Sequence, residues 1–115
     1  GVLIVGRRSV VIGSRVTLSA RCMLLDTGLQ VGDPERRHAE SEIVIEDDVW
    51  VGAGAIVLAG VRIGRGAVIG AGSVVSRSIP ANCVAVGNPA RPIRYLSPVA
   101  GGAVADGVDA DRSIL

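Results

Sequence analysis

Ile and Val recur at every sixth position along much of the chain. Written in sixes from Ile45, the sequence reads IEDDVW, VGAGAI, VLAGVR, IGRGAV, IGAGSV and VSRSIP, and each group opens on one of these two residues. Glycine holds the fourth place in four successive groups, as expected where the backbone turns through a positive φ that a Cβ would resist. A period of six matches neither an α-helix, with about 3.6 residues per turn, nor a simple meander of hairpins. The pattern predicts a β-helix, a solenoid whose short strands stack coil on coil.

The period is broken once, between two repeat segments. The groups IGSRVT and LSARCM run from Ile12, so we expect solenoid over residues 4–25 and again over 43–80. Between these segments, Asp26 to Glu42 carry polar and charged residues, Gly and Pro without an aliphatic period. These residues, 26–42, are therefore predicted to form a loop that is extruded from the coil.

At 115 residues the chain is long enough for one domain. We expect an all-β domain over residues 1–96. Residues 97–115 are small, acidic and aperiodic, which is typical of a disordered tail. Because the first residues already fit the repeat, strand edge and aliphatic surface are expected to be exposed at the first coil, in a truncated product or in one that a partner caps.

Charge and cysteine content exclude several functional classes. Twelve arginines nearly balance eleven acids, so we expect no strongly basic face and no bulk binding of nucleic acid. A small arginine cluster could still bind phosphate. Cys22 and Cys83 lie far apart without a CxxC pattern, so we expect buried free thiols and no metal site. The first residues show no charged n-region with an A-x-A site, and no apolar run is long enough to cross a bilayer, so we expect a cytoplasmic protein.

The segment VIGAGSVVSRSIPANCVAVGNPARPIR, residues 68–94, resembles the hexapeptide-repeat acyltransferases, in particular the galactoside and maltose O-acetyltransferase-like enzymes. The resemblance extends from about Ile12 to Arg94. It implies a left-handed parallel β-helix and a homotrimer that holds acyl-CoA in the groove between neighbouring subunits. It further implies transfer of an acetyl group from acetyl-CoA to a hydroxyl of a sugar or polysaccharide precursor.

In that family the catalytic histidine lies in an extruded loop with a pattern like Asp-Thr-x-x-His-Pro, which continues towards Asp-Pro-Glu-Arg. Here the loop reads DTGLQVGDPERR, which places Gln30 at the histidine position, or Leu29 in an alternative alignment. Neither side chain can accept a proton from an attacking hydroxyl. His38, the only histidine, is the one candidate to replace the base, and the opposing interpretation is a solvated residue among charged neighbours. An inactive trimeric scaffold that keeps CoA binding is the alternative function.

The resemblance also implies where CoA binds. Backbone amides near two alanines would bond the pantetheine arm, a serine followed by an arginine matches a hydroxyl-basic pair of the family, and two later arginines would meet the nucleotide phosphates. Guanidinium groups suit this role because they form charge-assisted, bidentate pairs with phosphate. The opposing interpretation of each arginine is a solvated surface charge. The implied residues are Ala53, Ala71, Ser76, Arg77, Arg91 and Arg94.

Overall fold

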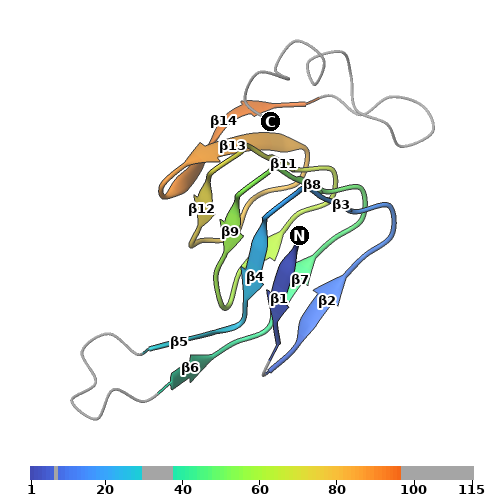
Figure 1. Ribbon diagram of the computed structural model, residues 1–115. Helices are drawn as coiled ribbons and strands as arrows, with labels where there is room; N and C mark the ends of the chain where they lie inside the picture. Colours follow the sequence, from blue (N-terminus) through green and yellow to red (C-terminus); the bar gives the residue numbers. More distant parts are fainter. Residues whose placement is uncertain (7, 30–37, 97–115) are drawn as a thin grey trace.

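The computed structural model describes residues 1–6, 8–29 and 38–96, and all helical or extended structure within these ranges is β-strand (Figure 1). The strands in chain order are β1 (Leu3–Val5), β2 (Val10–Ile12), β3 (Thr17–Leu18), β4 (Met23–Leu25), β5 (Thr27–Leu29), β6 (His38–Glu40), β7 (Ile43–Ile45), β8 (Trp50–Val51), β9 (Ile56–Val57), β10 (Arg62–Ile63), β11 (Val68–Ile69), β12 (Val74–Val75), β13 (Cys83–Gly87) and β14 (Ala90–Tyr95). The expected disordered tail, residues 97–115, lies outside the described residues.

The parallel strands wind into stacked coils with three faces. Sheet A contains β1, β4, β9 and β12, sheet B contains β2, β7 and β10, and sheet C contains β3, β8, β11 and β13, with β14 added antiparallel at its end. In each coil the chain passes from sheet A to sheet B to sheet C, so neighbours within a sheet come from successive coils. In the last coil Ile79 continues sheet B through a parallel bridge to Ile63. This is the parallel β-helix that the six-residue period predicts.

The first residue of each hexad points into the solenoid. Aliphatic side chains of successive coils therefore stack in register along each face, and this stacking builds a core in a chain that contains no Phe. Burial of one such side chain contributes roughly 1.5–3 kcal/mol. None of the stacked residues is more than 4% exposed. They are Leu24, Val57 and Val75 in sheet A, Ile45 and Ile63 in sheet B, and Val51 and Ile69 in sheet C. In the last coil, where the six-residue phase changes, Ile79 and Ala85 continue the stacks of sheets B and C.

The turns between strands use a left-handed residue at the fourth place of the hexad. The four predicted turn glycines all have positive φ, between 70° and 80°. Four residues with a Cβ adopt the same conformation elsewhere in the solenoid, with φ between 53° and 62°. The glycines are Gly54, Gly60, Gly66 and Gly72, and the other four are Arg15, Arg21, Asp48 and Asn82. The hexad thus fixes the backbone conformation more strictly than it fixes the residue type.

An insertion interrupts the second coil between β4 of sheet A and β7 of sheet B. The two ends of the insertion pair as antiparallel strands, with Thr27 opposite Glu40 and Leu29 opposite His38. We call this pair of strands the β5–β6 ribbon, and Figure 1 shows it projecting from the side of the solenoid. Because β4 pairs with β9 and β7 pairs with β10, the coil resumes in register after the insertion.

The first coil exposes aliphatic side chains, as the sequence led us to expect. Ile4 and Ile12 occupy inward positions in register with the buried Leu24 and Ile45, yet they are 45% and 38% exposed. Within the described chain no further coil lies beneath them. At the other end of the solenoid β14 closes sheet C, and Leu96 packs over the outer side of that sheet.

Candidate active site

The register of the β5–β6 ribbon places the only histidine of the chain. His38 pairs directly with Leu29 across the ribbon. Directly opposed residues of antiparallel strands are immediate neighbours across the ribbon. Position 38 therefore lies beside one of the two positions that the resemblance gives to the catalytic histidine. The other position, Gln30, lies outside the described residues.

Asp26 forms the root of the ribbon, and the sequence indicated it only as the start of the loop. Its carboxylate is fully buried and accepts hydrogen bonds from the backbone N–H groups of Arg8 and Ser9 and from the hydroxyl of Thr27. Its backbone carbonyl accepts a hydrogen bond from the N–H of Ser41, where the insertion returns to the coil. Nothing in the sequence indicates that this acid, at the edge of an aliphatic repeat, is buried.

Ala53 and Ala71, the expected pantetheine contacts, lie one above the other. They occupy the turns that lead from sheet C to sheet A in successive coils, and the N–H of Gly72 donates to the carbonyl of Ala53 at 2.8 Å. Both alanines are exposed. The two coils approach closely here, because a Cβ placed on Gly52 would lie only 2.7 Å from the backbone nitrogen of Ala71.

Ser76 and Arg77 lie at the opposite end of β12 from Ala71. Both side chains are exposed, at the turn that leads from sheet A towards sheet B. One chain therefore presents the expected CoA-binding residues on two different corners of the solenoid and on the terminal strand, and does not gather them at one corner.

Arg91 and Arg94 lie on the same side of sheet C because of a β-bulge. Residues three apart in a regular strand face opposite sides of the sheet. In β14, however, Arg91 pairs with Val86 and Arg94 pairs with Val84, and the register shifts between these pairs so that Ile93 is the extra residue. A bulge of this kind re-aims a side chain. Both arginines consequently share the outer side of sheet C, which the spacing in the sequence alone does not predict.

Trp50 also belongs to the outer side of sheet C. It is half-buried against the cluster of Val68, Val84 and Leu96, and its indole Nε1 donates a hydrogen bond to the hydroxyl of Ser19 at 2.9 Å. Within one chain this side chain therefore packs against the terminal segment of the solenoid.

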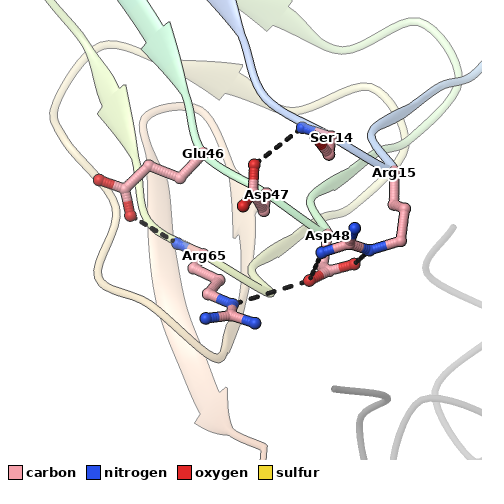
Figure 2. A network of polar contacts seen from close by, with 6 residues as sticks. All are labelled: Ser14, Arg15, Glu46, Asp47, Asp48 and Arg65. Atoms are coloured by element: carbon pink, nitrogen blue, oxygen red, sulfur yellow. Dashed lines mark hydrogen bonds and ion pairs between the residues drawn. The ribbon is translucent and has the colours of Figure 1, made fainter. Parts of the chain in front are cut away.

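A network of charges covers the corner between sheets B and C (Figure 2). Asp48 bonds Arg15 of the coil below at 2.6 Å and lies 3.7 Å from Arg65 of the coil above, and the hydrogen bond from Arg15 is the main reason that the pKa of Asp48 is lowered. Asp47 accepts the N–H of Ser14 at 2.8 Å. The guanidinium groups are largely exposed, so each of these ion pairs contributes only a small free energy to stability.

Glu46 completes this corner beside a shallow surface pocket of about 310 Å³. Its carboxylate accepts hydrogen bonds from the guanidinium of Arg62 and the backbone N–H of Arg65, and the bond from Arg62 is the main cause of its lowered pKa. Val11 and Val44 line the apolar part of the pocket. The pocket lies on sheet B and at its corner with sheet C, and the sequence did not predict it.

The cysteines are buried free thiols, as predicted, and burial raises the pKa of both Cys22 and Cys83. In the described part of the chain no three His, Cys, Asp or Glu side chains gather where they could hold a metal ion. The described residues likewise contain no helix with the length and apolar character needed to cross a membrane.

The comparison with known proteins agrees with the repeat seen in the structure. The model of the family described as bacterial transferase hexapeptide (six repeats) matches residues 42–77. The chain carries this hexapeptide repeat. This hexapeptide-repeat protein is 44% identical over 93 residues to a Schizosaccharomyces pombe protein named as a candidate acetyltransferase, covering 76% of this chain and 41% of the relative.

Two solved structures extend the similarity of the hexapeptide-repeat protein to most of its length. A hexapeptide-repeat acetyltransferase of Vibrio cholerae O1 biovar eltor, complexed with acetyl coenzyme A, matches 84% of this chain and 54% of its own, at 31% identity and a TM-score of 0.79. A galactoside acetyltransferase in complex with coenzyme A matches 94% of this chain and 52% of its own, at 35% identity and a TM-score of 0.80. The chain thus spans about half the length of these relatives or less. The expected left-handed parallel β-helix and the resemblance to hexapeptide-repeat acetyltransferases are confirmed.

Proposed function

We propose that this protein is an acyl-CoA-dependent O-acyltransferase, which transfers an acetyl group from acetyl-CoA to a hydroxyl of a sugar or polysaccharide precursor. The observation that carries the proposal is the match of 84% and 94% of the chain to two acetyltransferases solved with acetyl coenzyme A or coenzyme A. We place the protein in the cytoplasm, because acyl-CoA is an intracellular metabolite.

His38 is the proposed general base. An imidazole, with an ordinary pKa of about 6.5, can take the proton of the acceptor hydroxyl while the oxygen adds to the thioester carbonyl. The C–S bond then breaks, and the CoA thiolate leaves and takes up the proton, so that the products are an ester and free CoA. The pairing of His38 with Leu29 supports this role, because Leu29 is one of the two positions, with Gln30, to which the resemblance assigns the family's base.

CoA binding is proposed for the backbone near Ala53 and Ala71, for Ser76 with Arg77, and for Arg91 with Arg94. The shared side of the last two arginines supports a common phosphate contact. Because the residues are spread over two corners and β14, we propose that the groove is completed by a neighbouring copy in a homotrimer.

The outer side of sheet A supports association with another copy of the chain. It carries aliphatic side chains that are only half-buried within one chain, and a contiguous apolar face of this kind is typical of protein interfaces. Sedimentation of the purified protein tests this point, with a trimer mass as the expected result and a monomer mass as the contrary one. The half-buried residues are Met23, Leu25, Ile56, Leu58 and Val74.

The activity is tested by release of free CoA thiol from acetyl-CoA in the presence of a panel of sugars, followed with a thiol-reactive dye. For a parent with acceptor-dependent turnover, His38→Ala is expected to lower kcat by about 100- to 10,000-fold. Glu40→Gln, which neutralises a charge on the same strand, is the matched control and is expected to stay within twofold. Turnover that survives His38→Ala would exclude His38 as the base.

The alternative is an inactive trimeric scaffold that retains CoA binding, and the observation that favours it is Gln30 in the place of the family's histidine. In this case the parent binds CoA in calorimetry but shows no turnover with any acceptor. Turnover gained only in Gln30→His would establish the scaffold interpretation, because a single substitution would then restore the missing base.

A further inference from the structure

Asp26 carries the one fully buried carboxylate that the structure describes, and it lies at the root of the β5–β6 ribbon. One carboxylate oxygen, Oδ2, accepts the N–H groups of Arg8 at 2.6 Å and Ser9 at 2.8 Å. The other, Oδ1, accepts the hydroxyl of Thr27 at 3.0 Å. Burial of a carboxylate is costly unless hydrogen bonds satisfy it, and successive backbone N–H groups form a concave site suited to an anion.

The backbone of Asp26 ties together the same segments. Its N–H donates to the carbonyl of Val5 at 3.2 Å in the first coil, and its carbonyl accepts the N–H of Ser41 at 3.1 Å. Asp26 is thus bonded to the first coil, to the outgoing strand through Thr27, and to the segment by which the insertion returns. Three stretches of chain that are distant in sequence meet at this residue.

We propose that Asp26 is a positioning residue that holds both ends of the β5–β6 ribbon on the first coil and thereby fixes where position 38 lies. The catalytic consequence rests on the proposed function, whereas the anchoring itself does not. In Asp26→Asn the amide oxygen can stay with the N–H pair of Arg8 and Ser9 while the NH2 group faces the Thr27 hydroxyl, but the negative charge that strengthens all three hydrogen bonds is lost.

Asp47 provides a matched control. Its carboxylate also accepts a backbone N–H from the first coil, that of Ser14 at 2.8 Å, but at the corner between sheets B and C, where no ribbon leaves the solenoid. Asp47→Asn therefore removes the same charge between the same two coils without touching the ribbon. A general loss of coil stability affects both variants, whereas a loss of anchoring affects only Asp26→Asn.

The test is hydrogen exchange of the backbone amides of residues 27–29 and 38–40, measured against core amides of β9 and β11. Asp26→Asn is expected to raise the exchange rate of the ribbon amides at least tenfold relative to the core, and Asp47→Asn to leave this ratio within twofold. The single histidine gives one set of imidazole NMR signals, and these are expected to shift or broaden only in Asp26→Asn. Equal ratios in the two variants would overturn the proposal.

If Asp26→Asn does not fold, Thr27→Val removes one hydrogen bond from the carboxylate and is expected to raise ribbon exchange about threefold to tenfold; no rise in ribbon exchange overturns the proposal. In an active parent, kcat of Asp26→Asn is expected to fall at least tenfold while KM for acetyl-CoA stays within twofold. A parent without turnover contradicts the proposed function but leaves the exchange result as a complete test of the anchor.

Discussion

Replacement of Gly52 by alanine is expected to destabilise the solenoid more than replacement of Gly72, because the two glycines are needed for different reasons. A Cβ on Gly52 would lie 2.6 Å from the carbonyl oxygen of Ile69 and 2.7 Å from the nitrogen of Ala71, both backbone atoms of the next coil. A Cβ on Gly72 meets nothing within 4 Å, and its only difficulty is a φ of +70°. The first substitution must push neighbouring coils away from each other, whereas the second strains only its own backbone.

The expected costs follow from these contacts. In Gly52→Ala, overpacking and the stretching of the 2.8 Å bond from the N–H of Gly52 to Ile69 should together destabilise the protein by about 3 kcal/mol. In Gly72→Ala, an L-residue in the left-handed region costs about 1 kcal/mol. The difference corresponds to roughly a thirtyfold change in the unfolding equilibrium.

The assay is urea unfolding followed by the fluorescence of Trp50, the only tryptophan, which is half-buried on sheet C. Both variants and the parent are compared at one protein concentration, because association with other copies would make the midpoint depend on concentration. If Gly72→Ala proves as destabilising as Gly52→Ala, or more so, then close approach of the coils is not what requires glycine at the second place of the hexad.

Two further predictions concern the charged residues. Replacing Arg91 and Arg94 together by Ala is expected to weaken calorimetric binding of CoA at least tenfold, while Arg62→Ala, an exposed arginine on sheet B, leaves it within twofold; unchanged affinity in the double variant would refute the phosphate assignment. The pKa of Asp48 in the folded protein is lowered mainly by its hydrogen bond from Arg15. The ionised Asp48 therefore stabilises the fold above the unfolded carboxyl pKa of about 3.8, and this stabilisation is lost as the pH falls through the lower pKa of the folded state. The stability difference between parent and Asp48→Asn should therefore shrink on acidification in that range, and a difference that is constant between pH 2 and pH 6 would contradict it.

The sequence predicted the solenoid because one physical requirement recurs in every coil. Inward places need an aliphatic side chain, and turn places need a residue that accepts a positive φ. The second requirement reaches beyond glycine: Arg15, Asp48 and Asn82 adopt the same conformation with a Cβ present. A search for glycine alone therefore locates the turns of the second and third coils better than those of the first.

The candidate site was less predictable, because its features depend on pairing between strands. The bulge at Ile93, which brings Arg91 and Arg94 to one side, arises from the register with β13 and leaves no mark in the spacing of the arginines. The pairing of His38 with Leu29 likewise depends on how the ends of the insertion meet. The sequence identified these residues as candidates, and only the fold shows which of them are neighbours.

The insertion in the second coil begins and ends at neighbouring points of the backbone, because Asp26 and Ser41 are hydrogen-bonded to each other. The strands on either side, β4 and β7, keep the partners that an uninterrupted coil would give them. A change in length or sequence between Asp26 and Ser41, which leaves these two residues in place, is consequently expected to alter neither the core nor the register of the solenoid. Residues between Asp26 and Ser41 can therefore be exchanged without refolding the coils that carry them; under the proposed function, this is the structural condition for new acceptor specificities to evolve on one unchanged scaffold.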